Sequence, residues 1–359
     1  MSIYDIDGNR IDGGGGDGTD IISVNDPDRT LEKLQQLNRA TRTSGGANAH
    51  FGTTPLCLIH FSDIHGDGHA LQRIVDYKTH YDSYIVDIIH SGDIVKGDSS
   101  DGIAFWENIN GAKYILNCIG NHDSKNNNGW TGLTAADCYT TYFNPFIANW
   151  NVTIGSNVCY YYKDYSSQKV RLIVLDAMHQ DSTQLQWFIN TLDDARTNGF
   201  DVIAVSHVYP YKKNTIPSNE PWDATQDWNK TDGRLGNDGA YPAILADDYA
   251  VAVNAFQEND GQFICWLNGH LHRRLFRTLY DYPNQLVITV TNGGDKYASN
   301  PSCERVQNTK TEDCFNVIAV DTYQKILRGI SVGANIDRFM RGWNEFCYDY
   351  NLHTLITSR

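Results

Sequence analysis

Short apolar runs recur along the chain from residue 55 onward, and amphipathic or polar stretches separate them. The runs cover residues 56–61, 84–90, 114–119, 170–175, 202–205, 263–267, 286–291 and 315–320. A last run, 325–330, follows the turn 321–324 and can pair with the run before it. Apolar residues recur at helical spacing in 69–81 and 182–198. This alternation predicts an α/β sandwich whose central strands are apolar throughout because both faces of each sheet are covered.

Two stretches, 124–168 and 209–250, break this rhythm. The first is rich in Asn, Thr and aromatic residues, and the second carries Trp222, Trp228 and Tyr241 among many Asp and Asn residues. Long loops in a compact domain usually serve a function, so we interpret both stretches as walls of a functional cleft. Surface insertions without a function are the alternative.

The two ends of the chain differ from its central part, residues 51–335. Residues 1–50 contain a Gly run at 13–16 and a short helix candidate after Thr30. We predict that they form an N-terminal arm, or docking segment, with a Gly-rich tether. Residues 336–359 form a C-terminal tail with aromatic residues at positions 339, 343, 346 and 348.

Composition narrows the class of protein. Hydrophobic residues make up 41% of the chain and aromatic residues 12%, which is typical of a globular protein with a large core. The formal net charge of -14 predicts an acidic exterior that repels extended polyanions. Nucleic acid is therefore disfavoured as a partner.

The cysteines and the N-terminus argue against several further kinds of site and segment. The 8 Cys residues include no Cys-x-x-Cys pair, which argues against a zinc ribbon or a redox motif. Cys303 and Cys314 flank a polar loop and could pair in an oxidising compartment, but free thiols are the default. No signal peptide and no membrane-spanning run of about 18 apolar residues is present. We expect a soluble protein, cytoplasmic by default, with a virion location as the alternative.

Five short clusters of metal-ligand residues stand at or just after apolar runs. Strands of successive βαβ units run parallel, so their carboxyl ends and the residues that follow meet at one edge. In the first cluster, alternation along an extended segment would place both ligands on one side. Each cluster alone is a weak signal, but five in this order make coincidence improbable. The clusters are Asp63-Ile64-His65, Gly92-Asp93, Gly120-Asn121-His122-Asp123, Ser206-His207 and Gly269-His270-Leu271-His272.

Together these clusters resemble the signature of the calcineurin-like metallophosphoesterases, a purple-acid-phosphatase-like family. The resemblance runs from about Leu56 to Ile330 and omits the N-terminal arm and the C-terminal tail. It implies a four-layer α/β/β/α sandwich with mixed sheets. It also implies two divalent metal ions, for which mixed N and O ligands suit Mn, Fe, Zn or Ni.

The resemblance assigns the ligands residue by residue. The first metal is expected on Asp63, His65 and His272, and the second on Asn121, His207 and His270. Asp93 is expected to bridge the two ions. Glycines at 92, 120 and 269 would permit tight turns that bring the backbone close to the metals.

The expected reaction is an in-line attack on phosphorus by a metal-bridging hydroxide, without a covalent intermediate. His122 is the candidate proton donor to the leaving oxygen, and Asp123 could orient it. No Ser or Cys nucleophile is expected, because neither a Gly-x-Ser-x-Gly motif nor a P-loop is present. His60 and His90 are interpreted as core residues, although His90 could support Asp93 from behind.

The expected substrate is a small phosphoester, and the sequence leaves open whether it is a monoester or a diester. Stacking by Tyr209, Trp222 and Trp228 would favour a nucleotide-like substrate, but these residues could equally belong to the loop core. A different class of function is an interaction protein with an accessory phosphoesterase domain, which would bind a protein partner through the N-terminal arm. The segment Tyr4-Asp5-Ile6-Asp7-Gly8-Asn9 is weakly similar to hairpins of phage virion proteins.

Overall fold

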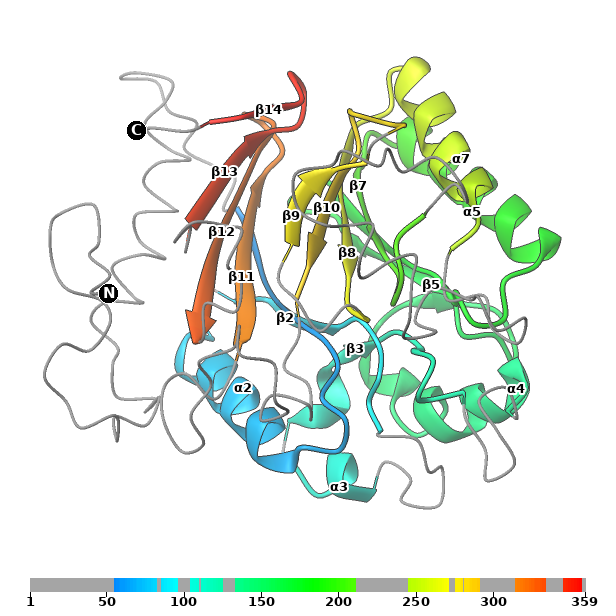
Figure 1. The fold of residues 1–359 in the computed structure, drawn as a ribbon, viewed down its shortest axis with the longest axis vertical. Helices are drawn as coiled ribbons and strands as arrows, with labels where there is room; N and C mark the ends of the chain where they lie inside the picture. Colours follow the sequence, from blue (N-terminus) through cyan, green and yellow to red (C-terminus); the bar gives the residue numbers. More distant parts are fainter. Residues whose placement is uncertain are drawn as a thin grey trace, which may run out of the picture.

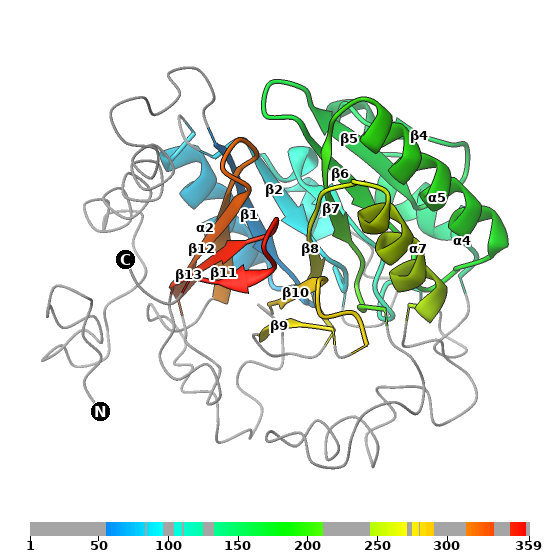
Figure 2. The same ribbon diagram turned by 90° about the horizontal axis from the view of Figure 1, so that it is seen from above.

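The computed structural model describes ten segments of the chain. They are residues 55–82, 85–95, 104–109, 111–124, 133–210, 245–270, 275–279, 281–290, 314–333 and 345–356. Within them, two seven-stranded mixed sheets lie face to face. Helix α2 lies outside the first sheet, and α5 and α7 lie outside the second (Figures 1 and 2). This arrangement confirms the predicted α/β sandwich. The proposed N-terminal arm lies outside the described residues.

The first sheet has the strand order β14-β13-β12-β11-β1-β2-β3. Its centre is parallel: β1 (Leu56–Phe61), β2 (Asp87–His90) and β3 (Leu116–Asn117) point the same way. Strand β11 (Cys314–Asp321) runs antiparallel to β1 on its other side. The parallel direction predicted for the first three apolar runs is therefore confirmed, and their carboxyl ends share one edge.

The C-terminal segment extends this sheet. Strands β12 (Ile326–Gly333), β13 (Glu345–Asp349) and β14 (Thr354–Leu355) add to β11 as an antiparallel series. Phe346 is buried, and its ring centroid lies 4.2 Å from that of Phe276. Residues 345–355, which the sequence placed in an aromatic tail, thus take part in the sandwich because their alternating aromatic side chains bury one face.

The second sheet has the strand order β4-β5-β6-β7-β8-β10-β9. Its four central strands, β6, β7, β8 and β10, are parallel. Helices α5 (Ser182–Thr197) and α7 (Asp247–Glu258) cover its outer face. The strands are β4 (Thr153–Ile154), β5 (Tyr161–Tyr165), β6 (Val170–Val174), β7 (Asp201–Val205), β8 (Phe263–Asn268), β9 (Leu275–Thr278) and β10 (Leu286–Thr289).

The two stretches interpreted as cleft loops contain regular structure. Strands β4 and β5 come from 124–168, and α7 begins within 209–250, at Asp247. Short helical turns occupy much of the rest of the first stretch: α4 (Ala135–Cys138), a π turn at Tyr139–Phe143 and a 3-10 turn at Ile147–Asn149. The loop interpretation was therefore wrong for these parts. Residues 211–244 lie outside the described segments.

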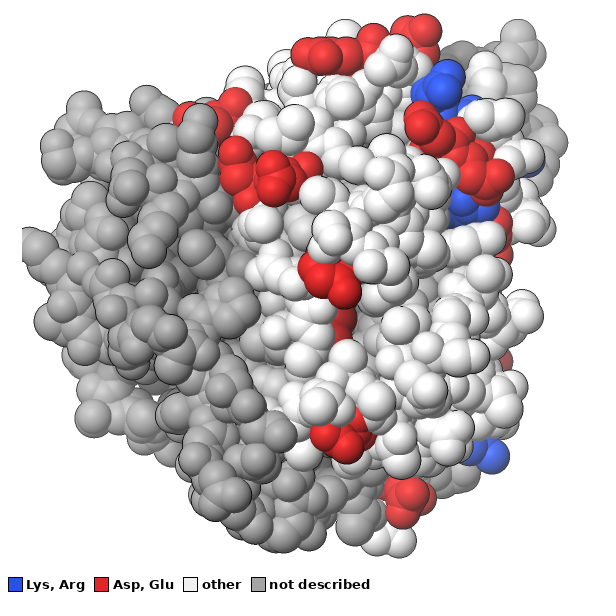
Figure 3. All heavy atoms as spheres, turned by 90° about the vertical axis from the view of Figure 1, so that its right-hand side faces the viewer, with Lys and Arg blue, Asp and Glu red and all other residues white. Residues whose placement is uncertain are grey.

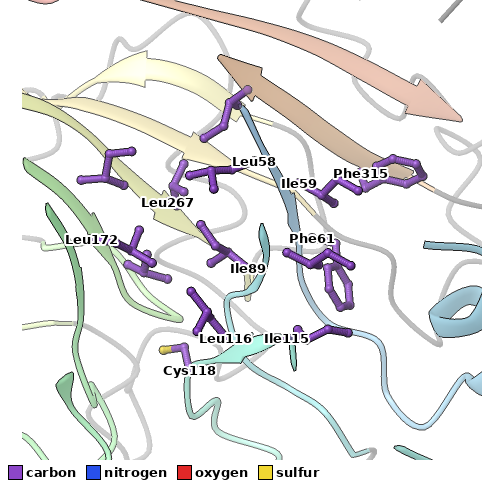
Figure 4. Close-up of a cluster of buried hydrophobic side chains, with 14 of the residues drawn as sticks. Leu58, Ile59, Phe61, Ile89, Ile115, Leu116, Cys118, Leu172, Leu267 and Phe315 are labelled. Atoms are coloured by element: carbon purple, nitrogen blue, oxygen red, sulfur yellow. The ribbon is translucent and has the colours of Figure 1, made fainter. Parts of the chain in front are cut away.

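The core fills the space between the sheets. In Figure 4, Leu58, Ile89 and Leu116 of the first sheet face Leu172 and Leu267 of the second. On the opposite face of β1, Ile59 and Phe61 lie beside Ile115 and Phe315. Helix α2 (Gly68–His80) covers this side, and the Asp67 side chain caps its first turn by accepting from Ala70 N. Smaller helices α3 (Ala104–Glu107) and η2 (Ala112–Tyr114) complete the layer.

The surface agrees with the acidic composition. Figure 3 shows the face formed by α5 and α7, on which Asp and Glu side chains are more widespread than Lys and Arg. Among the described residues, no helix is both long and apolar enough to cross a bilayer. Cys303 lies outside these residues, so its pairing with Cys314 stays a prediction.

A buried polar contact joins the two sheets at the end of β7 remote from the clustered ligands. The Asp201 carboxylate accepts from Lys325 Nζ at 2.8 and 2.9 Å and from the Tyr350 hydroxyl at 2.6 Å. Asp201 begins β7, whereas Lys325 and Tyr350 belong to turns of the first sheet. This contact ties the C-terminal strands to the body of the domain.

Replacing Tyr350 with Phe should lower the free energy of unfolding by about 2 kcal/mol, since a hydrogen bond to a buried charged group is lost. Urea denaturation would measure the change. Tyr323→Phe is the control, because Tyr323 is 60% exposed and should change stability by less than about 0.5 kcal/mol. Equal stability of the two variants would show that the Tyr350 hydroxyl contributes nothing.

Candidate metal centre

The ligand clusters predicted from the sequence meet at one edge of the sandwich. They follow the carboxyl ends of β1, β2, β3, β7 and β8, which come from both sheets. All the predicted site residues in these clusters are described except His272, which lies in the segment 271–274 outside the described residues. The parallel topology therefore brings together residues that are up to about two hundred positions apart in the chain, as the pair His270–Asp63 shows.

Left-handed backbone conformations set the direction of several ligands. The φ angles are 54° at Asp63, 47° at His65, 61° at Asp93 and 68° at His270. Such values are uncommon for residues other than Gly and are found where the surrounding structure enforces them, often at functional sites. The segment after β1 is thus not extended, so the expectation that strand alternation places Asp63 and His65 on one side was wrong. Their side chains converge through these turns.

Backbone hydrogen bonds hold the first two ligand loops against each other. Asp63 N donates to Gly92 O at 2.9 Å, and His65 N donates to Asp93 O at 3.1 Å. The Asp63 carboxylate in turn accepts from His270 N at 3.1 Å with both oxygens. These contacts fix the loops after β1, β2 and β8 relative to one another, and they do not require a bound metal.

The side chains expected at the first metal lie around His65. Its Nε2 atom is 3.9 Å from Asp63 Oδ1 and 3.7 Å from Asp93 Oδ2. Asp63 and Asp93 are almost completely buried. Two carboxylates and an imidazole nitrogen therefore face one small volume, with separations suited to ligands of a common cation.

The side chains expected at the second metal meet at the amide oxygen of Asn121. His207 Nε2 lies 3.0 Å and His270 Nδ1 2.9 Å from Asn121 Oδ1. Asp93 Oδ2 lies 3.3 Å from His207 Nε2, so the same carboxylate oxygen faces both ligand groups. The other oxygen, Asp93 Oδ1, accepts from His122 N at 2.8 Å. Asp93 thus presents one oxygen to the shared space and keeps the other on the backbone.

The chemistry of these donors fits a bound cation. His207 Nδ1 is 2.8 Å from the carbonyl oxygen of Ser91, which can only accept, so Nδ1 carries the proton. In the neutral ring the Nε2 lone pair then faces Asn121 Oδ1 and Asp93 Oδ2, which also lack protons. Asp93 Oδ2 is buried and has no hydrogen-bond partner in the described part of the chain. Either an extra proton or a cation must relieve this concentration of lone pairs.

Electrostatics show how strongly the site attracts positive charge. Burial alone would raise the pKa of Asp93, but His207, His122 and His65 hold it well below its usual range. Burial lowers the pKa of His207, whereas the charge of Asp93 and the contact with it outweigh burial and raise the pKa to about 9. The metal-free site therefore favours a proton at His207, which a divalent cation would displace.

His122 lies at the open side of this cluster. Its side chain is 19% exposed, while those of His65 and His207 are 2% and 0% exposed. The ring stands edge-on to His65 with centroids 4.5 Å apart, and Nε2 is 3.9 Å from Asp93 Oδ2. This position beside the ligands and next to solvent is the one expected for a group that contacts substrate.

The Asp123 carboxylate supports the ligand loops. One carboxylate oxygen accepts from Asp93 N at 2.9 Å and Gly120 N at 2.8 Å, and the other from Ile94 N at 2.7 Å and Val95 N at 3.1 Å. Burial and the charge of Asp93 raise the pKa of Asp123 to about 7 in spite of these four donors. The Asp123 carboxylate thus joins the loop after β2 to the loop after β3, and a role in orienting His122 stays a prediction.

The histidines inside the strands behave as core residues, as predicted. Burial lowers the pKa of both His60 and His90 to about 3, so both rings are neutral. The His90 ring packs against both Phe61 and Trp106, and neither of its nitrogens has a hydrogen-bond partner in the described segments. Support of Asp93 by His90 was thus a wrong expectation. Sequence reasoning instead missed Ser91, whose backbone carbonyl orients His207.

The three motif glycines are required by close packing. Gly92 has φ 101°, and a Cβ there would lie 2.5 Å from His207 Nδ1. A Cβ at Gly120 would overlap Asp93, and one at Gly269 would overlap the Ser62 hydroxyl. The close backbone approach predicted from these glycines is confirmed, because each lets one ligand loop lie directly on another.

Of the aromatic residues considered for substrate stacking, only Tyr209 is described. It is 4% exposed, and its hydroxyl accepts from Arg277 Nη2 at 3.4 Å. Tyr209 packs in the core beside Val208 and Leu245. The stacking interpretation is therefore wrong for Tyr209, while Trp222 and Trp228 lie outside the described residues.

A family model and one solved structure agree with this picture. A family model described as calcineurin-like phosphoesterase matches residues 58–274. The fold is similar to the crystal structure of a dimetal phosphatase from Danio rerio, with a TM-score of 0.51, 11% identity and coverage of 82% of this chain and 99% of that one. A second solved structure, that of a Thermus thermophilus protein, gives a TM-score of 0.39, 12% identity and coverage of 77% and 98%. None of the curated proteins compared with the chain matches it.

Proposed function

Because this chain belongs to the calcineurin-like phosphoesterase family, we propose that it hydrolyses small phosphoesters with two divalent cations held at the carboxyl ends of its central strands. The observation that carries the proposal is the meeting of Asn121 Oδ1, His207 Nε2 and His270 Nδ1 within 3.0 Å contacts, next to the buried Asp93 carboxylate. These atoms come from three separate loops, and two imidazole nitrogens converge on one amide oxygen. A structural role alone gives no reason for this convergence beside a buried carboxylate.

Two ligand groups would divide the cations. Asp63 and His65, with His272 as a proposed third ligand, would hold one ion, and Asn121, His207 and His270 would hold the other. Asp93 Oδ2 faces both groups and is the proposed bridge. Nitrogen and oxygen donors in this mixture suit Mn, Fe, Zn or Ni.

Bound cations would lower the pKa of a water molecule and neutralise the phosphate oxygens. The residues of the chain supply the remaining functions. His122, on the open side, would donate a proton to the leaving oxygen of the ester. Two thiols of the first sheet are unsuited as nucleophiles, since burial raises the pKa of Cys57 to about 12 and that of Cys118 well above its usual value.

The proton-donor role predicts a dependence on the leaving group. His122→Asn should lower kcat/KM about 10²-fold for an alkyl phosphate, whose alkoxide needs protonation. For a p-nitrophenyl ester the loss should be roughly tenfold or less, because nitrophenolate leaves without a proton. Steady-state kinetics with both substrates would measure the two losses. Equal losses would remove His122 from this role and leave it as a substrate-binding residue.

The proposed function is tested with the full-length protein. Elemental analysis should find two equivalents of transition metal, and hydrolysis of p-nitrophenyl phosphate or bis(p-nitrophenyl) phosphate should disappear with a chelator and return with Mn²⁺. The ratio of the two rates would assign the preference for monoesters or diesters. Protein that binds two metal equivalents but hydrolyses neither substrate nor a nucleotide monoester would contradict the proposal.

A further inference from the structure

The ladder between β7 and β8 changes register where two ligand motifs leave the sheet. Val205 pairs with Leu267, and Ser206 N donates to Leu267 O at 3.1 Å. In a regular parallel ladder, Ser206 O would then accept from Gly269 N, because Gly269 lies two positions after Leu267. Gly269 N instead donates to His207 O at 3.0 Å. The backbone has thus advanced by one residue on the β7 side, and Ser206 O has lost its backbone donor.

The side chain of Asn268 replaces this missing donor. Its Nδ2 atom donates to Ser206 O at 2.6 Å, and the residue is fully buried. Its own carbonyl accepts from Val290 N at 3.2 Å, which holds Asn268 to the neighbouring strand β10. Asn268 Oδ1 has no partner in the described segments, so the bond to Ser206 O is the polar contact that fixes this amide.

The register step decides where two ligands lie. His207 directly follows Ser206, and His270 follows Gly269, so both depend on the bonds at this step. Their rings lie 5.1 Å apart and reach the same atom, Asn121 Oδ1, at 3.0 and 2.9 Å. Without the step, the ladder would pair Ser206 O with Gly269 N and displace one of the two histidines along its strand.

We infer that Asn268 is a positioning residue for one metal site: its amide stabilises the β7–β8 register step that brings His207 and His270 onto one ligand atom. The inference rests on the proposed function because it takes both histidines as ligands. An amide suits the position for a physical reason. It supplies a donor without charge, whereas a carboxylate of the same shape would face the Ser206 carbonyl with no proton to give.

The test compares Asn268→Leu, which keeps the approximate shape and removes the donor, with Val170→Ala. Val170 is a fully buried residue at the start of β6, outside the β7–β8 ladder, so its truncation lowers stability without touching the ligands. Titration of the metal-free full-length proteins with Zn²⁺ by calorimetry would give the affinity of each equivalent. In Asn268→Leu, one of the two equivalents should weaken about 10–100-fold, as for other supports of metal ligands, and the other should change less than about threefold. Val170→Ala should keep both affinities.

The outcomes separate this inference from the function. The inference would be overturned if Asn268→Leu bound both Zn²⁺ equivalents with wild-type affinity. It would also be overturned if both variants weakened both equivalents to the same extent, because that result would reflect stability alone. Should Asn268→Leu fail to fold, Asn268→Ser, whose hydroxyl is too short to reach the Ser206 carbonyl, gives the same comparison. Wild-type protein that binds no Zn²⁺ would contradict the proposed function itself.

Discussion

Replacing Asp93 with Asn is expected to reduce metal-dependent hydrolysis by about 10³-fold or more, since several kcal/mol of charge stabilisation is lost and each 1.4 kcal/mol is about a factor of ten in rate. Asp93 Oδ2 faces His65 at 3.7 Å and His207 at 3.3 Å, so its negative charge serves both ligand groups. The amide would retain the shape of the side chain but not the charge that holds two cations side by side.

Two measurements would check this expectation: kcat/KM with saturating Mn²⁺, and the metal content of the purified variant. At least one equivalent of metal should be lost from Asp93→Asn. Asp201→Asn is the matched control, because it removes the charge of another buried carboxylate. Asp201 lies at the start of β7, whereas the ligand His207 follows the end of this strand. That variant should lose stability and keep its metal. Wild-type activity in Asp93→Asn would refute the bridging role.

The centre of the fold could be predicted from the sequence because its signals are local. The first strand was predicted at residues 56–61 and found at Leu56–Phe61, where every residue is buried. A strand covered on both faces must be apolar throughout, so its limits coincide with the limits of the apolar run. The same reasoning located β7 and the helix that precedes it.

Strand β5, which lies next to the edge strand β4, could not be predicted in this way. Strand β5 reads Tyr-Tyr-Lys-Asp-Tyr, and only its first and last residues are buried. Its pairing with β6 and the bond from the Tyr165 hydroxyl to Asp87 at 2.7 Å hold it in place. Such contacts between distant residues leave no periodic pattern in β5 itself. The alternating aromatic residues of β13 were visible in the sequence but were assigned to a tail.

The candidate site shows the same division between local and distant information. Residue types and spacing identified Asp63, Asp93, Asn121, His207 and His270, and the structure brings them together. The sequence did not reveal the left-handed backbone at Asp63 and His65, because packing of the loop on Gly92 and Asp93 enforces it. The role of the Ser91 carbonyl was also hidden, since a backbone oxygen carries no signature in the residue type.

Asp123 provides the second large effect, and here it concerns stability as well as metal binding. Asp123→Asn should lower the free energy of unfolding of the metal-free protein by about 4 kcal/mol, because two buried backbone N–H groups would each lose an acceptor at a cost of about 1–3 kcal/mol. The wild-type carboxylate accepts four backbone N–H groups, two on each oxygen. In the variant, an amide nitrogen would face two of these donors and leave both without an acceptor.

Urea denaturation of the metal-free protein would measure the loss. Asp349→Asn is the control, since the Asp349 carboxylate also accepts two backbone N–H groups but in an exposed turn, where Asn forms the same bonds. The control should show a much smaller change. Equal stability of the two variants would mean that the Asp123 contacts contribute little to folding.

This experiment also separates the two roles considered for Asp123. A residue that oriented His122 would affect the rate on alkyl phosphates while leaving the stability of the metal-free protein unchanged. A residue that joins the loops of Asp93 and Asn121 should weaken metal binding and stability together, because Asp93 N and Gly120 N lose a shared acceptor. The geometry favours the second result. A loss of rate on alkyl esters with full stability would restore the catalytic role.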